Sequence, residues 1–250
     1  MDRWMTIRVG CCGWAVRGGR QAYFKTFETI EVQETFYRVP KLETLERMRG
    51  EAPEGFVFNM KAWQVITHPH TSPTWRRMKP PPGNPSRYGL LKHTRENLRA
   101  WEKVVEMADA LRPRVVVIQT PPSFGFSERN IENVNRFFSQ VSGSSFAVGW
   151  EPRGSWTAKT EIVEKICTRH GVIHITDLLR RKPTPAGPVV YTRLHGLGGG
   201  EVNYSYRYSD EDLVKLKELI SELRWRETYV MFNNVSMAAD AARFKELVPS

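Results

Sequence analysis

The chain contains 250 residues, of which 40% are hydrophobic and 26% are charged. This composition is typical of a globular protein and excludes an intrinsically disordered chain. No segment approaches the roughly 20 consecutive apolar residues of a membrane span, so we expect no membrane partner. The net charge of +10 favours an anionic partner, such as nucleic acid, a phosphorylated metabolite or an acidic surface.

Cysteine usage and the first residues of the chain indicate the cellular compartment. The three cysteines, Cys11, Cys12 and Cys167, have neither the number of a disulfide framework nor the spacing of a zinc site. Residues 1–10 lack the apolar segment of a signal peptide. We therefore expect a reduced, cytoplasmic protein.

Strand-like and helix-like segments alternate along the whole chain. Short runs rich in Val, Ile, Phe and Tyr predict strands at residues 7–12, 29–37, 56–61, 114–119, 146–151, 172–177, 189–195 and 228–233. Amphipathic patterns predict helices at residues 41–51, 94–111, 127–141, 157–170, 210–223 and 236–247. Eight strands, six of them followed by a helix, predict an α/β protein that forms one (β/α)8 TIM-barrel domain over residues 1–250. An open, doubly wound sheet is the alternative.

The connections between these segments differ in length. Those that lead from a helix into a strand are short, whereas residues 13–25, 62–93, 178–188 and 196–208 form long strand-to-helix loops. The longest, residues 62–93, is a Pro-rich basic insertion after the third strand. Long loops at the carboxyl ends of strands are typical of a barrel whose functional pocket lies on that face.

Three of these loops carry the excess positive charge. They contain eleven basic residues and no acidic one: Arg17, Arg20, Lys25, Arg76, Arg77, Lys79, Arg87, Lys92, Arg180, Arg181 and Lys182. Such a face either is simply solvated or attracts a polyanion, because clustered Arg and Lys release counterions from phosphates. Trp63, Trp75 and Tyr88 in the longest loop either stack on nucleic-acid bases or pin the loop to the barrel.

Strand alternation predicts which polar side chains enter the barrel. In the second strand, Glu31, Gln33, Thr35 and Tyr37 share the inward face, and Glu151 and Arg153 do so in the fifth. The seventh strand directs Tyr191, Arg193 and His195 inward, while Lys61, Gln119 and Asn233 end the third, fourth and eighth strands. Asp177 falls on the outward parity unless its strand bends. Buried charges need partners, so this set forms either a structural ion network or an active site.

Eight motifs in register resemble one known family. They are GCCGW at residues 10–14, IEVQETFY at 30–37, FNMK at 58–61, TH at 67–68, QTPP at 119–122, EPR at 151–153, YTRLHG at 191–196 and FNN at 232–234. The chain is thereby similar to the YecE-like family, also called domain of unknown function 72. This resemblance implies a TIM barrel with a strand-end pocket and no settled activity. Residues 15–20 form a more basic loop than the family pattern, and Gly154 stands directly before Ser155, so a histidine often found there is missing.

The leading functional hypothesis is a hydrolase of phosphodiester or phosphate-bearing substrates, with nucleic acid among them, by analogy with endonuclease-IV-like barrels. Glu31 and Glu151 would act as general base or as metal ligands, with His195 as general acid. A divalent metal would be held by Glu151, Asp177 and His195. Substrate and phosphate contacts would come from Lys61, Arg153, Arg193, Gln119, Tyr37, Asn233, Trp14 and His68. The alternatives are a non-catalytic nucleic-acid-binding protein and an acid–base enzyme for a sugar or sugar phosphate.

Overall fold

The computed structural model describes residues 6–141, 145–184, 188–223 and 226–248, and these form one eight-stranded parallel sheet. The strands are β1 (Thr6–Cys11), β2 (Thr29–Val32), β3 (Val57–Lys61), β4 (Val115–Gln119), β5 (Ala147–Glu151), β6 (Ile173–His174), β7 (Val189–Leu194) and β8 (Glu227–Phe232). Their order is β6-β5-β4-β3-β2-β1-β8-β7, and a parallel bridge between Thr176 and Thr192 joins the two outer strands. The sheet therefore closes on itself, which confirms the predicted TIM barrel.

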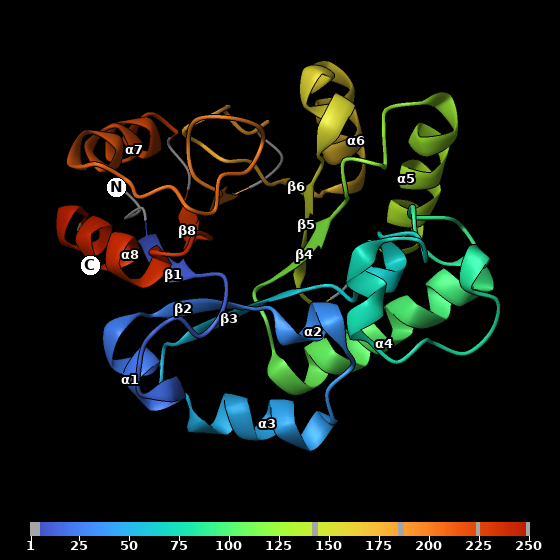
Figure 1. Cartoon of the computed structure of the whole chain (residues 1–250), viewed down its shortest axis with the longest axis horizontal. Coiled ribbons are helices and arrows are strands. Elements are labelled where there is room, and N and C mark those ends of the chain that lie inside the picture. The colour runs from blue at the N-terminus through green and yellow to red at the C-terminus, as the bar shows by residue number, and fades with distance from the viewer. Residues whose placement is uncertain (1–5, 142–144, 185–187, 224–225, 249–250) are drawn as a thin grey trace.

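Helices surround this barrel on its outer side (Figure 1). They are α1 (Gly19–Thr26), α2 (Glu34–Tyr37), α3 (Leu42–Glu51), α4 (Arg95–Leu111), α5 (Glu128–Val141), α6 (Thr160–His170), α7 (Asp210–Glu222) and α8 (Met237–Leu247). Local sequence explains where they start. The Ser209 side chain accepts a hydrogen bond from the N–H of Asp212, whose carboxylate accepts one from the N–H of Ser209, so a capping box begins α7. Among the described residues, no helix has both the length and the apolar character of a membrane span.

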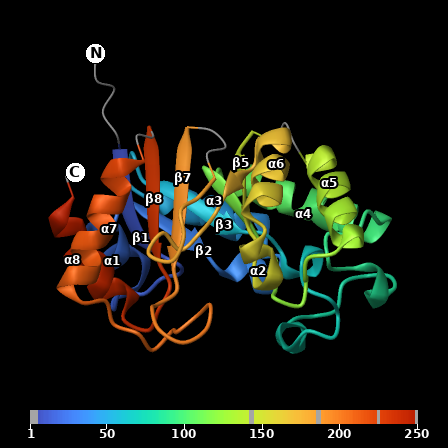
Figure 2. The same cartoon turned by 90° about the horizontal axis from the view of Figure 1, so that it is seen from above.

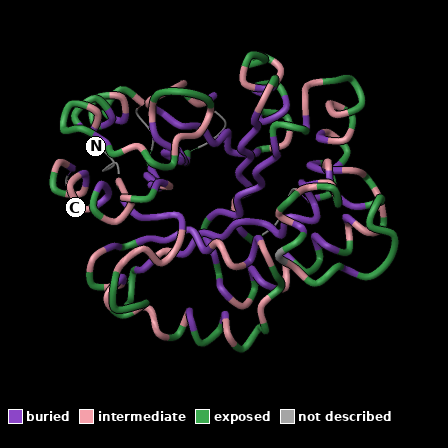
Figure 3. Tube along the Cα trace, in the orientation of Figure 1, coloured by how far each residue is buried: buried purple, intermediate pink, exposed green. Residues whose placement is uncertain are grey.

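Two apolar layers stabilise the barrel. Alternation sends Val116 and Ile118 of β4 outward against the helices, whereas Val115 and Val117 point to the axis. The inner cluster contains Cys12, Val115, Val117, Ile173, Ile175, Val189, Tyr191, Tyr229 and Met231. Buried strands thus occupy the centre of the molecule while exposed positions lie on the surrounding helices and loops (Figure 3).

The second predicted strand is too long. β2 ends at Val32, and residues 34–37 form the short helix α2 instead. The Thr35 hydroxyl donates to the carbonyls of Lys61 (2.7 Å) and Val32 (3.2 Å), which fixes this turn against β3. Because strand alternation stops at Val32, the inward placement predicted for Thr35 and Tyr37 on that basis is wrong.

Residues 19–25 of the first predicted loop belong to helix α1 instead. The loops that follow β3 and β7 lie at the same edge of the barrel (Figure 2). In the loop of residues 62–93, Trp75 and Tyr88 are buried, and the Trp75 indole N–H donates to the carbonyl of His68 (3.1 Å). Gly89 has φ +79°, and a Cβ there would lie 2.6 Å from the same carbonyl oxygen, so only glycine fits this close approach. These contacts hold the loop together, and Trp63, Trp75 and Tyr88 belong to the same outer apolar cluster as the strands and helices, which favours the sequence-based alternative that they pin the loop to the barrel.

Candidate functional site

A buried ion network lies inside the barrel where β2, β5 and β7 end. The Arg193 guanidinium contacts Glu31 Oε1 (2.9 Å) through Nη2 and Glu151 Oε2 through Nη1, and only 1% of the Arg193 side chain is exposed. The Tyr191 hydroxyl donates to Glu31 Oε2 (2.9 Å), and the Gln33 amide donates to Oε1. Both carboxylate oxygens of Glu31 are therefore engaged, and Arg193 bridges Glu31 and Glu151 through its two terminal nitrogens, whereas its Nε has no partner among the described residues.

Glu151 is the link between this network and the surface. Arg153 donates to its Oε1 from Nε (3.0 Å) and Nη2 (2.8 Å), and His195 Nε2 lies 2.8 Å from the same oxygen. Burial alone would raise the pKa of Glu151, but Arg153, Arg193 and His195 hold it well below its usual range. Glu151 is therefore an ionised carboxylate and a weak base.

His195 is held between Glu151 and Asn233, whose Nδ2 lies 3.0 Å from His195 Nδ1. Burial lowers the pKa of His195 to about 4, although Glu151 opposes this. The imidazole is therefore neutral near pH 7, which makes it a poor general acid at that pH. The structure thus brings together Glu31, Glu151, Arg153, Arg193, His195 and Asn233 from the predicted set.

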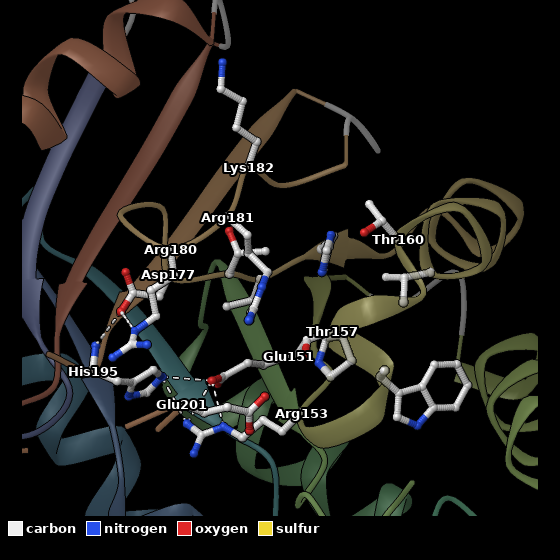
Figure 4. A pocket seen from close by; sticks show the side chains of 16 residues that line it. Glu151, Arg153, Thr157, Thr160, Asp177, Arg180, Arg181, Lys182, His195 and Glu201 are labelled. Atoms are coloured by element: carbon white, nitrogen blue, oxygen red, sulfur yellow. Dashed lines mark hydrogen bonds and ion pairs between the residues drawn. The ribbon is translucent and has the colours of Figure 1, made fainter. Parts of the chain in front are cut away.

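A cavity of about 70 Å³ opens beside Glu151, Arg153 and His195, between the ends of β5 and β6 and the start of α6. Figure 4 shows these three side chains joined by hydrogen bonds, with Asp177 directed toward His195 from the other side. The network is therefore not sealed from solvent.

Asp177 lies inside this site, and the outward placement first predicted for it is wrong. Ile173 and Ile175 belong to the inner cluster, so the same alternation carries Asp177 inward. Its Oδ2 accepts the backbone N–H of His195 (3.0 Å), and Arg180 Nε lies 3.7 Å away. Burial raises the pKa of Asp177 to about 6, although the His195 N–H and Arg180 oppose the rise.

His174 and Arg181 also line the cavity, and the sequence did not single them out as site residues. His174 Nδ1 accepts the backbone N–H of Thr184 (3.1 Å). Because a backbone N–H can only donate, the neutral ring carries its proton on Nε2. Neither that N–H nor the Arg181 guanidinium has a hydrogen-bond partner within the described residues. The cavity therefore presents two donors that lack an acceptor.

Lys61, Gln119 and His68 form a neighbouring polar group. Lys61 Nζ donates to Gln119 Oε1 (2.7 Å) and lies 3.7 Å from the centre of the Phe36 ring, against which the His68 ring also packs. Burial lowers the pKa of Lys61 to about 7, with Arg193 and Arg153 adding to the shift. Burial likewise lowers the pKa of His68 to about 3.

Of the predicted substrate contacts only Arg153 lines the cavity, and Trp14 and Tyr37 also lie outside the polar groups described above. Trp14 packs edge-on against Tyr23 and Phe24, in the outer apolar layer. Tyr37, at the end of α2, contacts Phe36. Neither residue lines the cavity beside Glu151.

The proposed metal ligands do not fit a divalent cation. Both oxygens of Glu151 are already occupied by guanidinium and imidazole groups. Arg153 and Arg193 would also repel a cation at that position. Across the part of the chain that the structure describes, no group of three or more His, Cys, Asp or Glu could hold a metal.

The basic loops are only partly free to attract an anion. Arg20 pairs with Glu51 (2.6 Å), Arg87 with Glu96 (3.1 Å) and Lys182 with Glu222 (3.0 Å). The loop after β6 contributes Arg180, Arg181 and Lys182 to the cavity lining. The cavity lining also holds the acidic residues Glu151, Asp177 and Glu201, so its basic side chains are largely balanced, and Arg181 is the one without an ion-pair partner among the described residues.

The chain is similar over most of its length to several known proteins. It is 24% identical to UPF0759 protein YunF of Bacillus subtilis (strain 168), over 94% of this chain and 91% of that protein. A DUF72 family protein of Thermotoga maritima MSB8 superposes with a TM-score of 0.69 at 24% identity, covering 98% and 99% of the two chains. One from Enterococcus faecalis V583 superposes with a TM-score of 0.72 at 18% identity over the whole of both chains.

More distant structures share the fold alone. Endonuclease IV from Thermus thermophilus superposes with a TM-score of 0.55 at 13% identity, covering 96% of this chain and all of that one.

A family described as "Protein of unknown function DUF72" matches residues 8–249, nearly the whole chain. This chain therefore belongs to the DUF72 family.

Proposed function

We propose that this chain is a hydrolase of small phosphate-bearing molecules and that it binds the phosphate group in the cavity beside Glu151. One observation carries the proposal: unpartnered donors and a buried, titratable carboxyl group line the same cavity. The donors are Arg181 and Nε2 of His174, and the carboxyl group belongs to Asp177. Guanidinium and N–H groups are the donors that phosphate oxygens accept most readily.

The size of the cavity supports a small substrate. Its volume of about 70 Å³ lies below the ~300 Å³ at the lower end of drug-sized ligand pockets. One phosphate group fits such a space, whereas a nucleic-acid strand does not. The position at the carboxyl ends of β5 and β6 is also where TIM-barrel enzymes carry their active sites.

In the proposed reaction, water adds to phosphorus, the P–O bond to the leaving group breaks, and Asp177 transfers its proton to the departing oxygen. The attacking water releases its own proton to solvent. A general acid works best when its pKa lies near the working pH, which favours Asp177 over His195. Arg153 and Arg181 stabilise the charge that develops on the phosphate oxygens.

The buried groups support this chemistry without touching the phosphate. Glu31 and Arg193 hold Glu151, and Glu151 in turn holds Arg153 at the cavity. These three are positioning residues in the proposal. Lys61 and Gln119 contact each other beside them and remain candidates for binding the rest of the substrate.

Release of inorganic phosphate from p-nitrophenyl phosphate, sugar phosphates and nucleotides tests the proposal. We expect Asp177→Asn to lower kcat by about 100-fold or more and Arg181→Gln to raise KM. Lys217→Gln, at an exposed position on α7, is the matched control and should leave both unchanged. Absence of phosphate release from the whole panel, or full activity of Asp177→Asn, would overturn the proposal.

The small cavity also favours a second candidate, an acid–base enzyme for a sugar or sugar phosphate with Asp177 as the proton carrier. This candidate predicts exchange of a sugar C–H proton with solvent deuterium and no release of phosphate. Nuclear magnetic resonance of sugar phosphates incubated in deuterated buffer separates it from the hydrolase.

Non-catalytic nucleic-acid binding is the third candidate. The exposed Arg76 and Lys79 of the long loop have no ion-pair partner among the described residues, and this observation favours it. It predicts that labelled DNA or RNA binds with a steep salt dependence. The affinity should then be unaffected by Glu151→Gln, and no cleavage product should form.

A further inference from the structure

A second hollow lies between the loop of residues 62–93 and the first turns of α4. Its volume is about 530 Å³, and none of its lining residues lines the cavity beside Glu151. We call it the α4 groove. A volume of this size falls within the ~300–1,000 Å³ of small-molecule sites.

One wall of the α4 groove is apolar and well anchored. It is formed by Trp63, Pro82, Tyr88, Ala100 and Val39. The Tyr88 hydroxyl donates to the Pro82 carbonyl (2.7 Å), which fixes the Tyr88 ring. Trp63 is only 9% exposed and its indole nitrogen is inaccessible to solvent, so the groove meets its ring and not its N–H.

The other wall is a row of cations. Arg95, Arg99 and Lys103 occupy successive turns of α4 and all line the groove. Like charges four residues apart on a helix repel each other. Lys103 is compensated by Glu106 (2.7 Å). Arg95 and Arg99 form no hydrogen bond or ion pair with a described residue.

The acidic residue of the groove does not cancel this charge. Glu96 lines the rim but pairs with Arg87 (3.1 Å). The groove thus combines an apolar aromatic surface and two uncompensated guanidinium groups. A ligand complementary to these two features has a flat apolar body and a terminal anionic group.

We propose that the α4 groove binds a small amphipathic anion, such as an aryl carboxylate. Its ring would pack on Trp63 and Val39, and its carboxylate would accept hydrogen bonds from Arg95 and Arg99. The site is independent of the proposed hydrolase, because it shares no residue with the cavity beside Glu151.

Isothermal titration calorimetry with 2-naphthoate tests the site, with 2-naphthamide as the uncharged analogue of the same shape. The carboxylate should bind roughly tenfold more tightly than the amide, the effect of one charge-assisted contact. The double variant Arg95→Gln and Arg99→Gln should remove this preference. Lys215→Gln with Lys217→Gln, which removes two exposed cations from α7, is the matched control and should keep it.

A steric variant locates the binding. Val39 is 37% exposed and lines the groove, so Val39→Trp should fill the space and abolish binding without disturbing the core. Val235→Trp, at a position 73% exposed and outside the groove, should bind like the unaltered protein.

Three results would overturn the proposal. They are equal affinities for the carboxylate and the amide, unchanged binding by Val39→Trp, and no saturable binding of 2-naphthoate at millimolar concentration. The binding measurements do not depend on phosphate release, so a failure of the hydrolase proposal would not affect them. Any phosphate release should be the same in these variants as in the unaltered protein.

Discussion

Replacing Arg193 with methionine removes the cation at the centre of the buried network. The side chains of Arg193, Glu31 and Glu151 are 1%, 0% and 7% exposed, so water cannot replace the lost partner. Removing one member of a buried ion pair costs about 3–5 kcal/mol, because the remaining charge is left uncompensated. Arg153 and His195 still contact Glu151, but Glu31 loses its cation, so we expect a loss within this range.

Urea unfolding followed by tryptophan fluorescence and circular dichroism measures this change. Arg136→Met is the matched control, because Arg136 pairs with Glu132 while both side chains are more than half exposed. Such a surface pair contributes about 0.5 kcal/mol or less. Adding Glu31→Gln to Arg193→Met should recover at least about 1 kcal/mol, because it removes the uncompensated buried charge.

The pH dependence of stability gives a second, independent readout. In the unaltered protein the pKa of Glu151 is well below its usual range. Ionised Glu151 therefore stabilises the fold at pH values above its unfolded pKa of about 4.3. This stabilisation is lost as pH falls toward the pKa of Glu151 in the folded protein. In Arg193→Met, Glu151 loses one of the cations that lower its pKa, so its folded and unfolded pKa values should differ less. The stability of that variant should therefore fall less steeply than that of the unaltered protein as pH falls below about 4.3. A loss below about 1 kcal/mol, or the same pH slope in both proteins, would refute this reasoning.

Three further predictions follow from single features of the structure. If Asp177 acts as the proton donor, phosphate release should fall as pH rises through about 6, and Asp177→Asn should show no such limb in its pH–rate profile. Gly10→Ala should lower the free energy of unfolding by about 1–3 kcal/mol, because its Cβ would lie 2.2 Å from the Thr29 carbonyl oxygen. Gly50→Ala in α3 is the control, since its Cβ would meet open space. Equal urea midpoints for the two variants would contradict this prediction. Cys11, Cys12 and Cys167 are buried, and burial raises the pKa of all three thiols. A disulfide reagent should therefore modify them only after unfolding in urea. Rapid labelling of the native protein would contradict this prediction.

The barrel could be predicted because the strand and loop patterns of the sequence are regular. The prediction of secondary structure was wrong where a tertiary contact overrides the local propensity. Residues 34–37 contain a threonine and two aromatic residues, which favour a strand. In the structure the Thr35 hydroxyl instead bonds the Lys61 carbonyl and turns the chain into α2. This contact joins segments 26 residues apart, so no local pattern reveals it.

The face assigned to the sixth strand shows a different limit. Both faces of residues 172–177 are buried in the barrel, so hydrophobicity does not distinguish inward from outward positions. The sequence therefore predicts an outward Asp177, whereas in the structure Ile173 and Ile175 face the barrel axis and Asp177 lies on their side of the strand.

The candidate site could be predicted only in its central part. Alternation within longer strands placed Glu31, Glu151 and Arg193 toward the axis, where the structure brings them together. His174 and Arg181 could not be found this way. They meet at the cavity because the loop after β6 folds back, so that the Thr184 N–H contacts His174 and the Arg181 N–H contacts the Asp177 carbonyl.

The bridge between Thr176 and Thr192 is the shortest pairing between neighbouring strands of the barrel, shorter than the two-residue pairings of β1 with β2 and of β3 with β4. β7 and β8 pair along six residues, whereas β6 contributes two residues to its pairing with β5 and a single bridge to β7. Backbone amides there should open to solvent exchange ahead of those in the longer ladders. The cavity beside Glu151 lies along this side of the barrel, so we expect the chain segments that border it to separate locally while the rest of the barrel keeps its hydrogen bonds.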